Sequence, residues 1–371
     1  MIQTSEYVSL GHPDKVADFI SSYILDAYLR EDPGVRYAVE CQIKDNRVTL
    51  GGEVTSSIRL TPTQYDNLVR EALEKVGYTR AYAEKWGLDN VPHPDKLVVD
   101  THLSQQSPDI ACGVDADGWG DQGIFWGMAT NEREFGCMPR DYWYARALGQ
   151  RLYHDARAGL LPIGLDIKTQ VEVTEGKATS VIVAAPMLDA WPEASIQEIV
   201  EETIDMMDDD CPVVINGTGR YVRHASMGDC GTTGRKLVVD FYGGNCRIGG
   251  GSPWTKDPSK ADLSLNVYAR QLALEYVKDH PSCEVVYVSL SSCIGLRSVR
   301  VVYFDRYNNI ICSRVEERPA SEIIHLLGLH SPCFAELCHS GLFSKVDEAV
   351  AGIKPKYGPS GSTGWVRSDN C

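Results

Sequence analysis

Hydrophobic residues recur with a helical period in several parts of the chain. In residues 16–28 the apolar side chains stand three and four positions apart, which predicts an amphipathic helix. Pro13 suits the first helical position because its missing N–H is not needed there, so His12 and Asp14 are expected at a helix N-terminus, among free amide groups. The same spacing predicts helices in residues 61–77, 141–156, 192–207 and 259–278.

Strand-like segments lie between these helices. Residues 35–43 and 47–54 read as two strands joined by a short turn, and residues 167–173 and 179–187 read as a second hairpin. Hairpins and helices thus come in units, which predicts an α+β fold with two or three such units. Further strands are expected at residues 97–103, 213–216, 236–242, 284–290 and 298–304.

Two segments follow neither period. Residues 102–123 are rich in Gly, Asp, Gln and Ser and are expected to form a long loop, of the kind that is often functional. The tail after about Phe343 has the Gly, Pro and Ser content of a loosely ordered end. No apolar run approaches the ~18 residues that a membrane helix needs, and the first residues show no secretory signal.

Cysteine content and charge narrow the possible functions. The twelve cysteines lack paired CxxC spacing, which argues against a zinc ribbon or a disulfide framework and favours buried thiols in a reducing, cytoplasmic compartment. The net charge of −15 disfavours general binding of nucleic acid or anionic membranes, since both need a basic face. An anionic small substrate would need a local nest of Lys, Arg and metal ions.

Two glycine-rich segments could supply such a nest. Residues 216–236 (NGTGRYVRHASMGDCGTTGRK) and residues 242–262 (YGGNCRIGGGSPWTKDPSKAD) combine glycines with lysine and arginine side chains. Backbone N–H groups in such loops form anion-binding concavities, and the cations add fixed counter-charge. Asp14 and Asp262 could hold Mg²⁺, which favours one or two carboxylates together with phosphate oxygens. Together these features predict a polyphosphate site.

Each feature also has an ordinary interpretation. A Gly-rich loop with a lysine is often only a turn, and neither segment matches the phosphate-binding pattern GxxxxGK[ST]. Asp14 could be a helix cap, His12 a structural hydrogen-bonding residue, and Glu53 an exposed carboxylate at a strand end.

Four longer motifs resemble those of one family. They are SEYVSLGHPDK (residues 5–15), GDQGIFWGMATNE (120–132), MGDCGTTGRKLVVDFYGG (227–244) and GGGSPWTKDPSKAD (249–262). All four resemble signatures of the S-adenosylmethionine synthetases, also called methionine adenosyltransferases. The shorter motifs GGEVTS, QSPDI and DIKTQV follow in the expected order, and the match runs from about Thr4 to Asp262.

The resemblance implies a fold, an assembly and a reaction. The fold would have three similar β-sheet-plus-helix domains related by pseudo-threefold symmetry and interleaved in space, expected at residues 1–101, 112–212 and 213–371. Residues 102–112 would form a mobile gating loop. The assembly would be a homodimer or a dimer of dimers with shared active sites. In the reaction, methionine sulfur attacks the ribose C5′ of ATP in line, and the tripolyphosphate that leaves is hydrolysed to pyrophosphate and phosphate.

The family's functional roles fall on matching residues of this chain. The implied catalytic residues are His12, Lys168, Asp229, Arg235 and Lys256. The implied substrate-binding residues are Glu53, Gln106, Asp121, Asp166, Lys168, Arg220, Tyr221, Asp229, Arg235, Lys236, Ser252, Lys256 and Lys260. Two Mg²⁺ per site would be held through Asp14 and Asp262, and K⁺ would be held through Glu40.

Several residues depart from the family's motifs, chiefly around the adenine and phosphate loops. Leu10 stands where an acidic residue is usual, and RHAS at residues 223–226 stands where a Gly-rich IGGP-like stretch is usual. The resemblance fades beyond Asp262, which puts subunit contacts in doubt. The other departures are Trp119, Gly217, Ile248, Ser252 and Thr255.

A divergent but active enzyme is therefore expected, with altered affinity or nucleotide preference left open. The alternatives are a non-catalytic relative that binds nucleotide and a polyphosphate hydrolase that uses only the second half-reaction. Methionine-binding positions such as Glu53 would have no purpose in the hydrolase.

Overall fold

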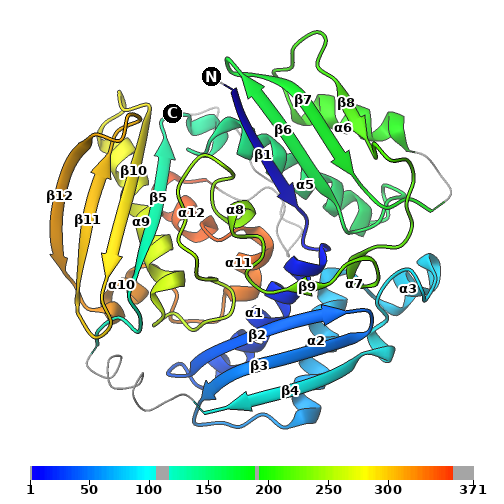
Figure 1. Ribbon diagram of the computed structural model, residues 1–371, viewed down its shortest axis with the longest axis horizontal. Coiled ribbons are helices and arrows are strands. Elements are labelled where there is room, and N and C mark those ends of the chain that lie inside the picture. Colours follow the sequence, from blue (N-terminus) through cyan, green and yellow to red (C-terminus); the bar gives the residue numbers. More distant parts are fainter. Residues whose placement is uncertain (1, 106–116, 189–191, 354–371) are drawn as a thin grey trace.

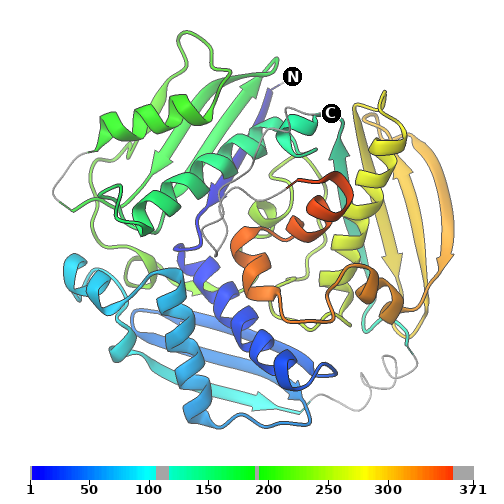
Figure 2. The ribbon, with the colours of Figure 1, turned by 180° about the vertical axis from the view of Figure 1, so that it is seen from behind.

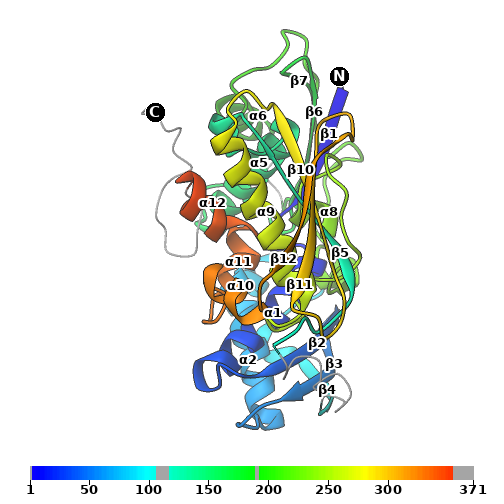
Figure 3. The same cartoon turned by 90° about the vertical axis from the view of Figure 1, so that its left-hand side faces the viewer.

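The computed structural model describes residues 2–105, 117–188 and 192–353 of the 371-residue chain. The longer helices lie on one side of the molecule and the β-sheets on the other (Figure 3). No helix in these ranges is long and apolar enough to cross a membrane. The predicted residue Gln106 and most of the predicted gating loop lie outside the described residues.

The described strands belong to three sheets (Figure 1). They are β1 (Ile2–Val8), β2 (Arg36–Lys44), β3 (Arg47–Thr55), β4 (Val98–Ser104), β5 (Gly123–Thr130), β6 (Lys168–Thr174), β7 (Lys177–Ala184), β8 (Val213–Ile215), β9 (Gly231–Thr232), β10 (Val285–Ser292), β11 (Ser298–Phe304) and β12 (Ile310–Glu317).

The described helices vary from short turns to the long α1 and α9. They are α1 (Pro13–Glu31), α2 (Pro62–Val76), α3 (Arg80–Trp86), α5 (Arg140–Arg157), α6 (Glu193–Thr203), α7 (Ala225–Gly228), α8 (Leu237–Asp240), α9 (Ala261–Asp279), α10 (Ala320–Leu326), α11 (Phe334–Ser340) and α12 (Ser344–Ala351), with 3₁₀ turns η1 (Pro94–Lys96) and η2 (Arg133–Phe135).

Each sheet has four strands and takes one of them from a distant part of the chain. The strand orders are β1-β6-β7-β8, β12-β11-β10-β5 and β4-β3-β2-β9. Strand β1 pairs antiparallel with β6, from Ile2 opposite Thr174 to Val8 opposite Lys168. Strand β5 pairs with β10, and β9 pairs with β2. The predicted α+β class is confirmed, whereas the pseudo-threefold relation and the domain limits stay predictions.

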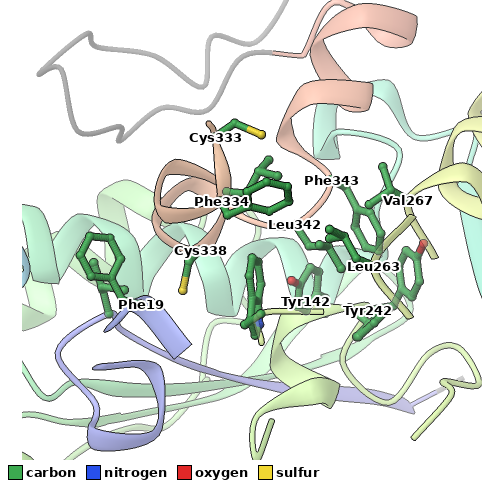
Figure 4. Close-up of a cluster of buried hydrophobic side chains, with 14 of the residues drawn as sticks. Phe19, Tyr142, Tyr242, Leu263, Val267, Cys333, Phe334, Cys338, Leu342 and Phe343 are labelled. Atoms are coloured by element: carbon green, nitrogen blue, oxygen red, sulfur yellow. The ribbon is translucent and has the colours of Figure 1, made fainter. Parts of the chain in front are cut away.

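One long helix covers the inner face of each sheet. Seen from behind, α1 covers the sheet of β2, α5 the sheet of β1 and β6, and α9 the sheet of β5 and β10 (Figure 2). Strands β2, β6 and β10 alternate between buried and more exposed positions, as strands with one face against helices must. Helices α11 and α12 then fill the centre, where Phe343 stacks on Tyr242 at 4.9 Å between ring centroids (Figure 4).

Helix α1 begins where the sequence predicts. His12 caps it, Pro13 occupies the first position, and Gly77 ends helix α2 with a left-handed backbone at φ 116°. Both hairpins and the helices at residues 141–156 and 259–278 are also present, with ends shifted by one to three residues.

Two predictions of local structure were wrong. Residues 236–242 were expected to form a strand, but Leu237–Asp240 form the short helix α8, because an apolar run this short fits both a buried strand and a buried helical turn. The tail after about Phe343 was expected to be loosely ordered; Ser344–Ala351 instead form helix α12, and residues 354–371 lie outside the described residues. In α12, Asp347 is fully buried and pairs with the Arg270 guanidinium, 2.9 Å from its Nε.

Candidate active site

Tight backbone packing sets the position of His12 at the start of α1. A Cβ on Gly11 would lie 2.2 Å from the carbonyl oxygen of Leu165, so only glycine allows the two segments to approach this closely. Ser9 completes the contact, since its N–H donates to Ile167 at 2.9 Å and its hydroxyl donates to the carbonyl of Leu165 at 2.6 Å. The start of α1 therefore lies beside the segment that carries Asp166 and Lys168.

His12 is a neutral ring with one donor left for a ligand. Its side chain is buried, and its Nδ1 accepts a hydrogen bond from the backbone N–H of Asp14 at 3.1 Å. Burial, and then the positive charges of Lys236 and Lys168, lower the pKa of His12 to about 3. Because Nδ1 is an acceptor in a neutral ring, the proton lies on Nε2, which can donate to an oxygen atom.

Asp14 joins the start of α1 to the Gly-rich segment of residues 216–236. Its Oδ1 accepts from the N–H of Thr232 at 2.9 Å, and its Oδ2 accepts from Lys236 Nζ at 2.6 Å. Arg235 Nη1 lies 3.7 Å from Oδ1. Burial raises the pKa of Asp14, but the hydrogen bonds from Lys236 and Thr232 outweigh it and the pKa is lowered. Asp14 is therefore an ionised carboxylate at neutral pH.

Lys15 points away from this cluster into a buried network of its own. Its Nζ lies 2.6 Å from Asp240 Oδ1, 3.1 Å from Asp18 Oδ2 and 4.5 Å from the centre of the Trp254 ring. Trp254 Nε1 donates to Asp240 Oδ2 at 2.7 Å, and Gly234 N–H donates to Asp18 at 2.9 Å. This network ties α1 to both Gly-rich segments from behind the site.

The next side chain of the site is that of Asp166. Its side chain is buried, its Oδ2 accepts from the N–H of Ala225 at 3.0 Å, and its Oδ1 has no hydrogen-bond partner among the described residues. The pKa of Asp166 is raised to about 6, chiefly by burial, with smaller contributions from the charges of Asp229 and Asp14; the hydrogen bond from Ala225 and the charge of Lys168 oppose this rise. The Tyr221 hydroxyl donates to the backbone carbonyl of Asp166 at 3.4 Å.

These contacts define a first cluster of charged and polar residues. Arg220, Asp229 and Lys168 are exposed at its edge. Asp229 accepts from the N–H of Cys230 at 2.8 Å, and Arg235 donates to the carbonyl of Cys230 at 3.3 Å. The first cluster consists of His12, Asp14, Asp166, Lys168, Arg220, Tyr221, Asp229, Arg235 and Lys236.

A second cluster surrounds the start of α9. Lys256 forms an ion pair with Asp262. A Cβ on Gly251 would lie 2.1 Å from Asp262 Cγ, so the Gly triplet packs directly against this carboxylate and a larger residue at Gly251 would displace it. Burial lowers the pKa of Lys260, while the charge of Asp257 opposes this shift. The second cluster consists of Asp121, Ser252, Lys256, Lys260 and Asp262, with Glu53 at its edge.

Strand β2 connects the two clusters. Thr232 pairs with Gln42 of β2, whereas Lys256 bridges to Ala38 on the same strand, four residues away or about 13 Å. Glu53 pairs with Ala38 from the other side. Between the two clusters, the exposed Glu40 accepts a hydrogen bond from the Thr233 hydroxyl.

The structure thus places every described candidate except Glu40 in one of two clusters, and it puts Asp14 and Asp262 in different ones. Each carboxylate is paired with a different lysine, Lys236 and Lys256 respectively. No group of three or more His, Cys, Asp or Glu side chains with metal-binding geometry occurs within residues 2–105, 117–188 and 192–353. A magnesium ion here would need ligand oxygens from a substrate besides a single carboxylate, which is a common mode for Mg²⁺.

Sequence reasoning missed the residues that hold the site from behind. Asp18 lies outside the quoted motifs, and Asp240 lies within the motif of residues 227–244 but was given no role; the three-residue spacing of Lys15 and Asp18 on a helix does signal an ion pair. His224 was noted only as a departure from the family's pattern. The structure places its neighbour Ala225 against Asp166, because the Ala225 N–H donates to Asp166 Oδ2.

Comparison with known proteins covers nearly the whole chain. Three family models match it: the S-adenosylmethionine synthetase N-terminal domain at residues 1–108, the central domain at 116–221 and the C-terminal domain at 224–350. The expectation that the resemblance ends near Asp262 was therefore wrong.

Individual relatives agree with the family models. The S-adenosylmethionine synthase of Paramagnetospirillum magneticum is 36% identical over 378 residues, which cover 94% of each chain. That of Pelagibacter ubique is 32% identical over 396 residues, covering 99% of this chain and 96% of the relative. The solved structure of an unusual S-adenosylmethionine synthetase from Campylobacter jejuni superposes with a TM-score of 0.77 at 30% identity over 96% of both chains. The chain therefore belongs to the S-adenosylmethionine synthetase family, as a divergent methionine adenosyltransferase that makes S-adenosylmethionine from ATP and methionine.

Proposed function

We propose that methionine sulfur attacks the ribose C5′ of ATP in line, beside His12, and that the tripolyphosphate released is hydrolysed in the same site. The observation that carries this proposal is the state of His12. Its ring is neutral, its Nδ1 accepts from the Asp14 N–H, its Nε2 carries the proton, and the positive charges of Lys236 and Lys168 help to lower its pKa. A donor among fixed cations suits the negative charge that develops on the leaving oxygen.

The reaction needs no general base, because a thioether is already nucleophilic. The protein's part is to align the reacting atoms and to stabilise the leaving group. Alignment alone contributes about 7–11 kcal/mol in favourable cases. Lys236 and Arg235 stand within 4 Å of the Asp14 carboxylate and supply positive charge that is already oriented before the substrate binds.

Substrate contacts are proposed for both clusters. In the first cluster, Asp166, Lys168, Arg220 and Tyr221 would contact ATP, and Asp229 would contact both substrates. In the second cluster, Glu53 and Asp121 would hold methionine, while Ser252, Lys256 and Lys260 would surround the phosphates or methionine. Gln106 is proposed to contact methionine as well, and its position lies outside the described residues.

The family's metal dependence is assigned here to Mg²⁺ and K⁺. Asp14 and Asp262 would hold two Mg²⁺ ions, because each is a carboxylate beside a lysine that could instead bind a phosphate. Glu40 would hold K⁺ with the Thr233 hydroxyl nearby. When bound, Mg²⁺ would neutralise charge on the phosphate oxygens.

A shared site between two copies of the chain is the proposed assembly, as a homodimer or a dimer of dimers. The two clusters are attached about 13 Å apart along β2, so a second copy could bring its Lys256 cluster against the His12 cluster of the first. The outer faces of the sheets are also apolar in places: Val98, Ile124, Ile310 and Val315 are all between 48% and 65% exposed. A cytoplasmic location is proposed from the cysteine content alone.

The reaction is tested by incubating the protein with ATP, methionine, Mg²⁺ and K⁺. The proposal predicts S-adenosylmethionine, pyrophosphate and phosphate in equal amounts. Cleavage of ATP without a sulfonium product would contradict it. Tripolyphosphate that accumulates intact would contradict the second step only.

A further inference from the structure

Residues 223–226 (RHAS) place a histidine ring at a position where the family resemblance leads one to expect glycine. The ring of His224 is buried, and it is followed by Ala225 with a left-handed backbone at φ 52°. An alanine with this backbone is strained, so the surrounding contacts must hold it in place.

A directional chain of hydrogen bonds runs through His224. The backbone N–H of Leu165 lies 3.1 Å from the Tyr82 hydroxyl oxygen, and that hydroxyl lies 2.8 Å from His224 Nε2. His224 Nδ1 lies 2.6 Å from the carbonyl oxygen of Val222, which can only accept. Nδ1 is therefore the protonated nitrogen, Nε2 accepts from Tyr82, and Tyr82 accepts from Leu165. Each of these polar groups has a partner of the right kind.

Aromatic and backbone contacts fix the His224 ring from the other sides. Trp86 meets it edge-on at 4.7 Å between ring centroids, and Tyr82 meets it edge-on at 6.0 Å. The backbone N–H of His224 donates to the carbonyl of Asn90 at 2.9 Å. A Cβ on Gly164 would lie 2.9 Å from Nε2, so the ring closes tightly over the segment that leads to Asp166.

Both ends of this chain reach the nucleotide side of the site. Leu165 precedes Asp166, and Ala225, next to His224, donates its N–H to Asp166 Oδ2 at 3.0 Å. Tyr221 lies three residues before His224 and donates to the backbone carbonyl of Asp166. The His224–Tyr82 pair therefore holds the two segments that present Asp166 and Tyr221.

We propose that His224 is a positioning residue for nucleotide binding: with Tyr82 it orients the Asp166 carboxylate and Tyr221 toward ATP. His224 itself touches neither substrate. The inference rests on the proposed role of Asp166 and Tyr221 in contacting ATP, and it assigns to this chain's histidine a task that a glycine could not perform.

The test compares three substitutions by steady-state kinetics. His224→Phe keeps a ring but removes the acceptor, and Tyr82→Phe removes the donor. Each is expected to raise the KM for ATP about tenfold, because a buried hydrogen bond is lost, with kcat and the KM for methionine unchanged within about twofold. His224→Gln places a carbonyl near the position of Nε2 and is expected to restore the KM for ATP to within about threefold of wild type.

The double variant and a control separate positioning from stability. If the two side chains act as one unit, His224→Phe with Tyr82→Phe raises the KM for ATP no further than either single change. The control, His339→Phe, alters a half-buried histidine on α11 and is expected to lower Tm without changing the KM for ATP. Equal changes in kcat and in both KM values, or no change in the KM for ATP, would overturn the proposal.

A binding measurement keeps this inference separate from the proposed function. ATP affinity, measured by calorimetry on the intact protein without methionine, is expected to fall about tenfold in His224→Phe. If wild type makes no S-adenosylmethionine but His224→Phe still loses ATP affinity, the proposed reaction fails and the positioning role stands. If wild type is active and ATP affinity is equal in both proteins, the positioning role fails alone.

Discussion

Lys236 Nζ donates to Asp14 Oδ2 at 2.6 Å, although 222 residues separate the two in the sequence. The contact joins the first turn of α1 to the segment just before α8, and both side chains are largely buried. It brings a carboxylate that could hold Mg²⁺ next to a cation that could hold phosphate. This pair is the centre of the first cluster.

Removing the lysine of this pair should strongly reduce turnover. For Lys236→Met we expect kcat/KM to fall by about 10²–10³, the loss seen when one preorganised donor to a developing anion is removed. The measurement is steady-state formation of S-adenosylmethionine. Lys177→Met is the matched control, because Lys177 pairs with Asp208 at 3.2 Å on the exposed surface and should change activity little. An equal loss in both variants would contradict the assignment.

Substitution of the carboxylate should act through the metal. In Asp14→Asn the concentration of Mg²⁺ needed for half-maximal activity should rise at least tenfold, since a neutral amide is a weaker ligand. Chelation of Mg²⁺ should abolish turnover in wild type. It should leave Tm nearly unchanged, because the described residues form no closed metal cage. A large loss of Tm on chelation would show a structural metal instead.

Acid should destabilise the protein partly through His224. Burial lowers the pKa of His224 to about 4, whereas an unfolded histidine titrates near 6.5. Between these values the unfolded state binds the extra proton, so the contribution of His224 is complete above pH 6.5 and is lost as the pH falls toward 4. The loss amounts to about 3 kcal/mol.

Denaturant unfolding of wild type and His224→Phe at several pH values measures this effect. As the pH falls from 6.5 to 4, the free energy of unfolding should decrease more in wild type than in His224→Phe. The stability of wild type relative to the variant should therefore decrease over that range. A difference that stays constant over that range would mean that His224 titrates normally in the folded state.

The C-terminal helix is anchored by a fully buried ion pair. Arg270 meets Asp347 at 2.9 Å and also donates to the carbonyls of Met128, Cys137 and Gly136. Asp347→Ala leaves this buried guanidinium without its counter-charge, so the free energy of unfolding should fall by about 3–5 kcal/mol. Glu284→Ala breaks an exposed pair with Arg306 and should cost less than about 1 kcal/mol in the same urea titration. Similar losses in both variants would refute the anchoring role.

The position where α1 begins was predictable from the sequence. The distant residues that contact this N-terminus were not. Pro13 and the apolar spacing after it mark the helix, and they place His12 and Asp14 at its N-terminus. The Gly-rich segments were recognisable as loops with cations. That Lys236 rather than Lys256 meets Asp14 depends on how β9 joins β2, and no local pattern encodes a pairing over such a distance.

The missed elements have physical reasons. Strand β12 is exposed at nearly every position, so it lacks the alternation that identifies a strand. Strand β1 pairs with β6, 160 or more residues away, and its short sequence carries no turn signal to a partner. Helix α12 depends on Asp347, whose buried partner Arg270 lies in another helix. Long-range partners therefore decide two of the three cases, β1 and α12, and exposure decides β12.

The most direct test of the account measures the products by mass spectrometry, with wild type and His12→Phe compared at equal concentration. Wild type should convert ATP and methionine into S-adenosylmethionine, pyrophosphate and phosphate in equal amounts. His12→Phe, which removes the Nε2–H donor, should make S-adenosylmethionine at least about 10² times more slowly while binding ATP with affinity close to that of wild type. Product formation at the wild-type rate in His12→Phe, or no sulfonium product from wild type, would contradict the account.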